Sequence, residues 1–418
     1  MKVIEKILFG AGEKGKSADF FWNMCASIVY SFQSAILLFV VTRISGLFVA
    51  GIFSISYIVS QTFAVVGSYS MRNYQVSDMK NKYSYGTYIY SRIISTIVMF
   101  VTCMVYSLLE GYTGEKLVLI AILCVYRAVD GYEDVYHGEM QKRNRLDVAS
   151  RIVTYRIVIS SAIFAIGVLC TNNIIFSTAL LTISAVLLSW GMNVVAISVM
   201  DMQQKPQKNQ VWKLLFEVAP ICIGAFLYSY LVNSPKYAIE NILSDDMQTI
   251  FNIIFMPVFV INMLSSFVFK PYVARMGIYW NEKKQKEFIK LLLLQVGCVL
   301  GITAIVMLAG FILGIPVLEF IYGVDLKQYK LLFMMLLAFG GITALDAFAL
   351  IVLTVMRLQN VVLVSYIVSL IVDVIFMNSL VIKYHMMGAG LVYGMSMVVI
   401  LLVSLVGIGM GLVQMKKE

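Results

Sequence analysis

The sequence predicts an all-α integral membrane protein with about twelve transmembrane helices, arranged as two six-helix repeats around a central cavity. Composition is the first observation behind this prediction. Of 418 residues, 60% are hydrophobic and 13% are charged, whereas soluble globular domains have about 45–50% and about 25%. The chain therefore lacks the polar surface that a water-soluble fold needs. We interpret its net charge of +9 as loop charge and expect no nucleic acid as a partner.

The apolar segments are the second observation, and they predict the number and order of the helices. A helix needs about 20 apolar residues to cross the hydrocarbon core of a bilayer. The segments that meet this requirement are 18–43, 47–71, 84–109, 115–139, 148–170, 174–199, 212–234, 244–270, 285–313, 328–356, 360–383 and 387–414. Gly314 and Pro316 follow the ninth segment directly and predict a break near the outer end of that helix.

The distribution of basic residues is the third observation, and it predicts the orientation. Most of the 32 Lys and Arg residues fall in loops on the same side as the N-terminus. Only a few, including Lys236, fall in the predicted loops of the opposite side. Because cytoplasmic loops carry the excess of basic residues, we expect a multi-pass membrane protein with both termini in the cytoplasm.

A polar connection predicts the domain boundaries. Residues 201–211 form the most polar stretch between two spans and are interpreted as a cytoplasmic linker. They separate a first six-helix bundle, 18–200, from a second, 212–414. A cytoplasmic N-terminal segment, 1–17, and a short C-terminal tail, 415–418, complete the chain.

The two predicted bundles resemble each other, which favours a transporter over an enzyme. Arg72 and Lys270 occupy equivalent places in the two halves. Halves with six helices each run in the same direction, as in transporters built from parallel repeats. No predicted loop is long enough for a soluble catalytic domain, and the two histidines, His137 and His385, lie in different halves. We therefore expect no enzymatic activity.

The fourth span carries a stripe of ionisable residues. Arg127, Asp130, Asp134 and His137 lie on one helix face, and Glu133 lies beside them. Each charge at membrane depth costs about 2.5–3.5 kcal/mol or more, so the stripe must face protein or water. In one interpretation it lines a cavity, where Arg127 binds an anion and a carboxylate carries a proton or Na⁺. In the other, Arg127 and Asp130 form an internal ion pair that only fixes helix packing.

Four further charged residues lie within predicted spans and leave two interpretations open. Arg92 and Arg156 lie near cytoplasmic ends, where they either snorkel to the interface or line the cavity. Asp346 and Asp373 lie deeper and form either a site for the coupling ion or hydrogen-bonded core positions.

The first span carries a stripe of small polar residues at helical spacing, Asn23, Ser27 and Ser31. Such a stripe serves either contact between helices or the lining of a substrate path. No metal site is expected, because no cysteine or histidine has a partner at metal-ligand spacing.

Three short motifs carry a resemblance to a known family. Gly46 and Gly51 share the glycine spacing of a turn between spans one and two. Gly138 and Gln141 end span four before a basic loop, and Pro220 lies near the start of the second half. With twelve spans in two halves, these motifs resemble the polysaccharide flippases of the MATE-like multidrug/oligosaccharidyl-lipid/polysaccharide exporter superfamily.

The resemblance implies alternating access by two helix bundles in a bacterial cytoplasmic membrane. The implied substrate is a polyprenyl-diphosphate-linked oligosaccharide repeat unit, turned from the inner to the outer leaflet for assembly of O-antigen, capsule or exopolysaccharide. Cationic side chains of the cavity would hold the diphosphate, with Arg127 first, followed by Arg156, Arg92 and Arg43. Expected partners are the lipid-linked glycan, membrane lipids, and a polysaccharide polymerase and glycosyltransferases. No cofactor is expected beyond H⁺ or Na⁺ as a coupling ion.

An ion-coupled multidrug exporter of the same superfamily is the main alternative. Its substrates are usually cationic, so its cavity favours carboxylates. The fourth span contains more acids than arginines in its central part, which keeps this alternative open.

Overall fold

The computed structural model describes most of the chain. The described residues are 2–10, 16–78, 82–202, 207 and 210–417. They form helices and turns, and no strand occurs among them. The predicted N-terminal segment and the predicted linker at 201–211 lie partly outside the described residues. The chain divides into two compact units, Met1–Phe226 and Leu227–Glu418.

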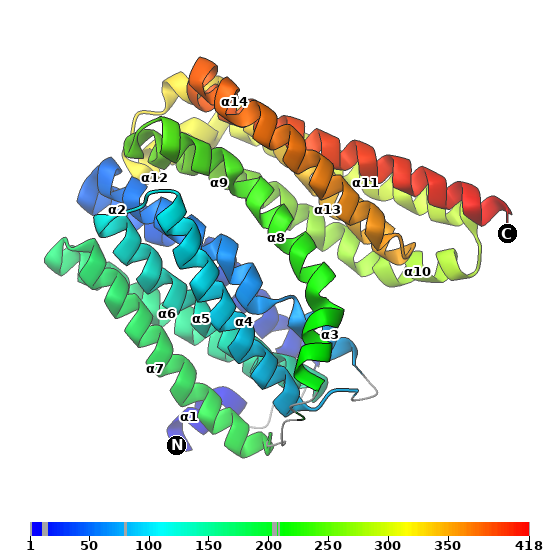
Figure 1. Ribbon diagram of the computed structural model, residues 1–418, viewed down its shortest axis with the longest axis horizontal. Coiled ribbons are helices and arrows are strands. Elements are labelled where there is room, and N and C mark those ends of the chain that lie inside the picture. The colour runs from blue at the N-terminus through cyan, green and yellow to red at the C-terminus, as the bar shows by residue number, and fades with distance from the viewer. Residues whose placement is uncertain (1, 11–15, 79–81, 203–206, 208–209, 418) are drawn as a thin grey trace. The chain divides into compact units, whose positions relative to one another are not determined.

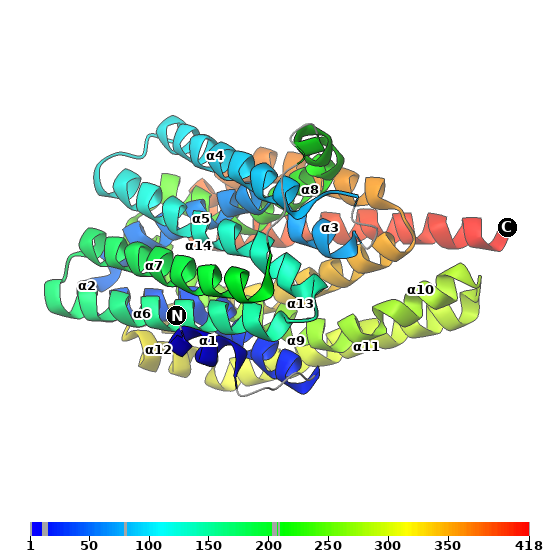
Figure 2. The ribbon, with the colours of Figure 1, turned by 90° about the horizontal axis from the view of Figure 1, so that it is seen from below.

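The first unit consists of helices, and short described turns join α4 to α5, α5 to α6 and α6 to α7. They are α1 (Lys2–Phe9), α2 (Lys16–Ser68), α3 (Met71–Ser77), α4 (Tyr85–Leu109), α5 (Gly114–Lys142), α6 (Leu146–Thr171), α7 (Ile174–Met200) and the first part of α8 (Val211–Ile242). Helices α4, α5, α6 and α7 lie alongside one another (Figures 1 and 2). Because α5 contacts α2, α3, α4, α6 and α7, its charged stripe is surrounded by protein.

The second unit contains the remainder of α8 and six further α-helices among its described residues. They are α9 (Asp245–Phe269), α10 (Val273–Asn281), α11 (Gln285–Ala309), α12 (Ile315–Tyr322), α13 (Lys330–Val355) and α14 (Gln359–Lys417). Within this unit α13 is central, because it packs against α9, α11 and α14. The helices of the second unit also run alongside one another in Figure 1.

The structure confirms the predicted all-α fold. Nine helices in the described part of the chain are long and apolar enough to cross a membrane. Two of them, α2 and α14, are each divided by one non-helical residue, Gly46 (φ 85°) and His385 (φ 52°). Both divisions fall between spans that the sequence predicts as separate. Helix α5 is not among the nine, and its ionisable residues explain why a hydropathy criterion omits it. With α5 and the two divisions included, the helices correspond to the twelve predicted spans.

Two local predictions were wrong. Helix α8 does not end at residue 234 but continues through Pro235 to Ile242, so Lys236 lies inside a helix rather than in a loop. Apolar side chains on the continued helix, such as Ile239, are buried and hold this extension in place. Helix α11 does not break at Gly314. It passes through a π-helical turn, Gly310–Gly314, into α12, whose first turn accommodates Pro316.

Candidate functional site

A cluster of buried charges is centred on α5 in the first unit. The helical repeat places Arg127 and Asp130 three residues apart on one face, where their side chains meet. Arg127 Nη1 lies 2.8 Å from Asp130 Oδ2. Arg127 is 2% exposed and Asp130 is partly exposed, so the pair is accessible only from the side of the carboxylate.

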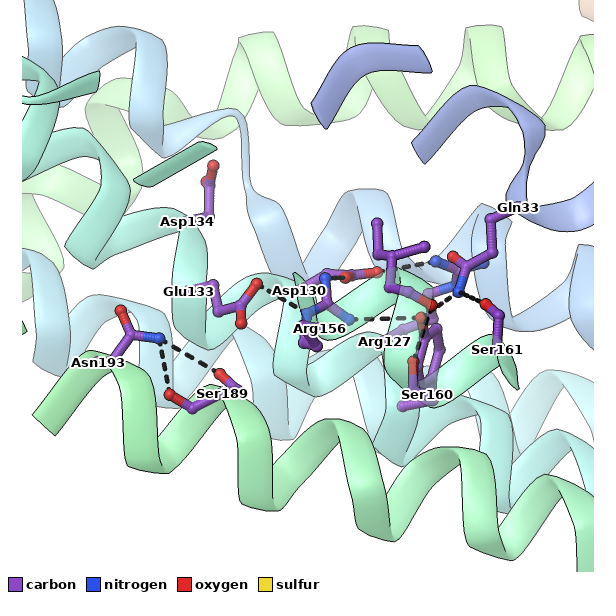
Figure 3. Close-up of polar contacts among 12 residues, drawn as sticks. Gln33, Arg127, Asp130, Glu133, Asp134, Arg156, Ser160, Ser161, Ser189 and Asn193 are labelled. Atoms are coloured by element: carbon purple, nitrogen blue, oxygen red, sulfur yellow. Dashed lines mark hydrogen bonds and ion pairs between the residues drawn. The ribbon is translucent and has the colours of Figure 1, made fainter. Parts of the chain in front are cut away.

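Asp130 also binds a second arginine, which comes from α6. Arg156 Nη2 lies 2.6 Å from Asp130 Oδ1, and Arg156 Nε lies 3.0 Å from Glu133 Oε2 (Figure 3). The Asp130 carboxylate therefore bridges the guanidinium groups of Arg127 and Arg156. Glu133 is the second carboxylate partner of Arg156. These four side chains carry two positive and two negative formal charges. Sequence reasoning identified all four as candidates and gave the Arg127–Asp130 pair as one alternative, but it did not assign Arg156 to Asp130 and Glu133.

Arg127 keeps hydrogen-bonding capacity that its surroundings do not use. Its guanidinium carbon lies 4.4 Å from the centroid of the Tyr57 ring and 5.3 Å from that of Tyr126. Among the described residues, its Nε and Nη2 atoms have no hydrogen-bond partner. A hydrogen bond to a charged group contributes about 1.5–3 kcal/mol. Arg127 is therefore a buried cation whose open donors suit an additional anionic oxygen.

Two polar residues outside the predicted set connect α2 to this cluster. Gln33 Nε2 donates to Tyr126 Oη at 2.5 Å and to Ser161 Oγ at 3.3 Å (Figure 3). Arg156 Nη1 donates to the same Tyr126 oxygen at 3.4 Å. Sequence reasoning placed Gln33 only beside the polar stripe of the first span, and it gave Tyr126 no role. A glutamine within an apolar helix was the signal that could have identified Gln33.

The predicted polar stripe of the first span lies elsewhere. Asn23, Ser27 and Ser31 are exposed on α2, whereas Gln33 on the same helix is buried. Ser27 Oγ donates to the Asn23 carbonyl oxygen of its own helix at 2.7 Å. Arg43, close to the division of α2 at Gly46, is exposed as well. All four residues are exposed, whereas Arg127 and Arg156 of the α5 cluster are buried.

A second pairing lies one turn further along α5. Arg92 of α4 places Nη2 2.7 Å from Asp134 Oδ2 and donates from Nη1 to the Gly67 carbonyl oxygen at 2.6 Å. Arg72 approaches the other Asp134 oxygen at 3.7 Å. Arg92 is buried, so its side chain does not reach toward the interface. His137 is buried too, and within the described residues its Nε2 has no hydrogen-bond partner.

The two predicted aspartates of the second unit have different surroundings. Asp373 Oδ1 accepts hydrogen bonds from Ser234 Oγ at 2.8 Å and from Ser396 Oγ at 3.2 Å. Asp346 is 2% exposed, and neither of its carboxylate oxygens has a hydrogen-bond partner in the described part of the unit. Asp373 therefore resembles a hydrogen-bonded core position, whereas the charge of Asp346 is uncompensated.

Lys236 is a buried cation of the second unit that sequence reasoning did not identify. Its Nζ donates to Asn233 Oδ1 at 3.1 Å and lies 4.7 Å from the centroid of the Phe255 ring. Removing an ion from water costs several kcal/mol. A cation–π contact returns about 0.5–2 kcal/mol and one hydrogen bond about 0.5–1.5 kcal/mol. These contacts do not offset the burial.

A polar contact at the turn before α4 fixes the start of α8 within the first unit. Lys82 Nζ lies 2.8 Å from Glu217 Oε1, and Tyr74 Oη donates to Glu217 Oε2 at 2.6 Å. The Glu217 carboxylate raises the pKa of Lys82 above its ordinary value. Burial alone would raise the pKa of Asp78. The backbone N–H groups of Lys82 and Tyr83, which donate to its carboxylate, hold that pKa below its usual range.

The described residues contain no group of three or more His, Cys, Asp or Glu side chains that could hold a metal ion. The charged cluster therefore consists of arginines, carboxylates and aromatic hydroxyls. Such a set can bind an anion through the guanidinium groups and exchange a proton or a monovalent cation at the carboxylates.

Comparison with known proteins shows the fold. No protein-family model and no curated protein match the chain. A multidrug resistance MATE family transporter of the MOP superfamily, in an inward-facing conformation, is 14% identical with a TM-score of 0.63, covering 100% of this chain and 99% of that one. The lipid II flippase MurJ, in an inward closed conformation, is 13% identical with a TM-score of 0.69, covering 94% and 90%.

A third similar structure is a MOP superfamily transporter from Pyrococcus furiosus, for which reverse polarity of the binding pocket suggests a different function. It is 15% identical with a TM-score of 0.56, covering 100% of this chain and 98% of that one. The chain thus has a MATE-like transporter fold over its whole length, as the sequence predicted. At these identities the comparisons establish the fold alone.

Proposed function

We propose that the protein is a flippase for a polyprenyl-diphosphate-linked oligosaccharide repeat unit. It turns this unit from the inner to the outer leaflet of a bacterial cytoplasmic membrane by alternating access. The unit then serves the assembly of a surface polysaccharide. The observation that carries this proposal is Arg127, a buried guanidinium with two nitrogen atoms that have no hydrogen-bond partner among the described residues. The similarity in fold to a lipid II flippase supports a lipid-linked substrate.

The proposed role of Arg127 is to bind the diphosphate. A diphosphate cannot cross hydrocarbon without a replacement for its hydration, and guanidinium groups supply parallel N–H donors that match phosphate oxygens. Arginine stays charged at physiological pH, so the site keeps its affinity on both sides of the membrane. The ring of Tyr57, 4.4 Å from the guanidinium carbon, orients the donors without using them.

The proposed role of the α5 carboxylates is to act as counter-ions when no substrate is bound. Asp130 neutralises Arg127 and shares Arg156 with Glu133. A diphosphate oxygen that binds Arg127 through its open donors leaves the Asp130 bridge in place. A diphosphate that enters more deeply replaces Asp130 as the partner of both arginines, and Arg156 then keeps Glu133 as its carboxylate partner. In the substrate-free protein both arginines therefore keep a carboxylate partner. This pairing lowers the free-energy cost of the conformational change that returns the empty protein to its starting state.

The coupling ion is proposed to bind in the second unit. Asp346 has no hydrogen-bond partner for either oxygen in the described residues, and Asp373 is held by two serine hydroxyls. A proton or Na⁺ at Asp346 would compensate its charge. Binding of that ion can therefore change the relative stability of the inward-open and outward-open states.

The test is deletion of the gene in the native host, with lipid-linked oligosaccharide measured separately in each leaflet and with surface polysaccharide measured in parallel. We expect the lipid-linked unit to accumulate in the inner leaflet and surface polymer to disappear. Unchanged pools and intact polymer, in a host without a second flippase, would refute the proposal.

Complementation of the deletion strain tests the role of Arg127. Arg127→Met should insert into the membrane but restore no polymer, whereas Arg275→Met should restore it fully. Arg275 is an exposed arginine whose Nε donates to Tyr279 Oη, and it serves as the matched control. Full activity of Arg127→Met would remove Arg127 from the mechanism.

An ion-coupled multidrug exporter is the second candidate, and Asp346 is the observation that favours it. A buried, uncompensated carboxylate suits a cationic substrate, and Tyr228, Tyr366 and Tyr393 lie near enough to interact with it electrostatically. In a drug-sensitive host this function predicts efflux of a cationic dye such as ethidium, which Asp346→Asn abolishes and Arg127→Met leaves unchanged. Absence of dye efflux by the wild-type protein would exclude it.

A further inference from the structure

Lys236 of α8 is a buried amine with few partners. It is 5% exposed, and its Nζ donates to Asn233 Oδ1 at 3.1 Å. The centroids of the Phe255 and Phe259 rings lie 4.7 and 5.5 Å from Nζ. An ammonium group has three donors, so within the described part of the chain two of them have no acceptor. When this amine is protonated, its charge is therefore solvated by one amide oxygen and two aromatic rings.

The buried arginines of the first unit differ from Lys236 in one respect. Arg92, Arg127 and Arg156 each have a carboxylate within 2.8 Å. Lys236 has no ion pair with any described carboxylate, although the second unit contains the buried Asp346 and Asp373. An internal salt bridge that only fixes helix packing needs both partners. Lys236 has no such partner, so an internal salt bridge does not explain a lysine at this place in the helix.

The surroundings of Lys236 indicate what kind of anion it would accept. Phe259, whose ring centroid lies 5.5 Å from the amine, is half exposed, so an accessible aromatic side chain lies next to Lys236. Ligand sites commonly combine an aromatic surface with one charged group that fixes orientation. A sugar ring that carries a carboxylate has both complementary parts, an apolar C–H face and an anionic substituent. A diphosphate has only the second.

We propose that Lys236 binds the carboxylate of an acidic sugar in the transported oligosaccharide, with the sugar ring packed on Phe259. This proposal rests on the proposed flippase function and specifies its substrate class, a lipid-linked glycan that contains a uronic acid or a similar acidic residue. The lysine suits this role because its ammonium is a compact charge with three donors that rotate to meet an oxygen.

The test compares two probes that differ only in the sugar carboxylate. The full-length protein in lipid nanodiscs is titrated with a farnesyl-diphosphate-linked disaccharide that ends in glucuronate, and with one that ends in glucose. The wild-type protein should bind the acidic probe at least about tenfold more tightly, which corresponds to about 1.4 kcal/mol. Lys236→Met should abolish this preference without changing the affinity for the neutral probe, which also shows that the variant is folded.

Three further variants complete the experiment. Lys236→Arg should retain the preference, because it keeps the charge. Lys284→Met, at an exposed lysine that pairs with Glu282, should behave as wild type. Arg127→Met should weaken binding of both probes by the same factor, because they share the diphosphate. A preference that survives Lys236→Met, or no preference in the wild-type protein, would overturn the proposal. Equal weakening of both probes by Lys236→Met would assign the amine to the diphosphate and overturn it too.

A third probe separates this proposal from the proposed function. If neither lipid-linked probe binds to the wild-type protein, the flippase function fails. Methyl glucuronide, which lacks the diphosphate and the lipid, is then titrated alone. Binding that Lys236→Met removes would support an acidic-sugar site that is independent of a lipid carrier. Absence of binding would overturn both proposals.

Discussion

The Asp130 bridge leads to a prediction that can be worked out quantitatively. Asp130→Asn preserves the size of the side chain and removes its charge. In the wild-type protein Asp130 Oδ2 lies 2.8 Å from Arg127 Nη1, and Asp130 Oδ1 lies 2.6 Å from Arg156 Nη2. After the substitution Arg156 keeps Glu133 at 3.0 Å. Arg127 keeps only aromatic neighbours among the described residues.

The expected destabilisation follows from the charge that is left uncompensated. Removing one partner of a buried ion pair costs about 3–5 kcal/mol. Because the Asp130 side chain is 17% exposed, water screens part of this cost, and we expect the lower end, about 3 kcal/mol. Arg127→Met leaves Asp130 paired with Arg156 and should cost about half as much. In the double variant the two effects should not add, with a coupling free energy of about 1–2 kcal/mol.

The assay is unfolding in mixed detergent micelles with increasing sodium dodecyl sulfate, followed by circular dichroism for the wild type, the two single variants and the double variant. Arg275→Met serves as the control for replacing an exposed arginine. Additive effects of Asp130→Asn and Arg127→Met, within about 0.5 kcal/mol, would refute the conclusion that these two side chains share a buried charge.

Three further predictions follow from single contacts. Arg92→Met should lower the free energy of unfolding by about 3 kcal/mol, because Asp134 is left without its closest cation; a loss below about 1 kcal/mol in the same assay would contradict a buried pair. Gly46→Ala should cost about 1–3 kcal/mol in that assay, because Gly46 has φ of 85° and ψ of 175°, a backbone conformation essentially restricted to glycine. The added methyl group meets no atom, so the cost comes from the backbone alone; an unchanged stability would contradict this conformation. The pKa of Asp78 is lowered in the folded protein, so its ionised carboxylate stabilises the fold. This contribution is fully present above the pKa of an unfolded aspartate, about 3.9, and is lost as the pH falls through the lower pKa of Asp78 in the folded protein. Proteolysis next to Lys82 should therefore accelerate on acidification in the wild type and not in Asp78→Asn, and equal acceleration in both would contradict this role.

The number of helices and the charged face of α5 were predictable because both depend on local properties of the chain. An apolar run of about 20 residues forms a spanning helix whatever its neighbours are. The three-residue spacing of Arg127 and Asp130 places them on one face of any helix. The same reasoning placed Asp346 and Asp373 inside spans. It also located both helix divisions, at Gly46 and at His385.

The pairing of charges and the environment of Lys236 were decided by the tertiary structure. Arg156 could meet Glu133 only after α6 packed beside α5, and nothing in the spacing of the chain specifies that contact. The segment around Pro235 is polar enough to be interpreted as a loop. Buried contacts along α8 carry the helix past it and leave Lys236 inside. The sequence by itself therefore determined that the charged residues of α5 and Arg92, Arg156, Asp346 and Asp373 lie within spans, because hydropathy and helical spacing are local. It did not determine the place of Lys236. Which charges are balanced between helices was decided only by packing, because the partners of Arg92 and Arg156 come from α5.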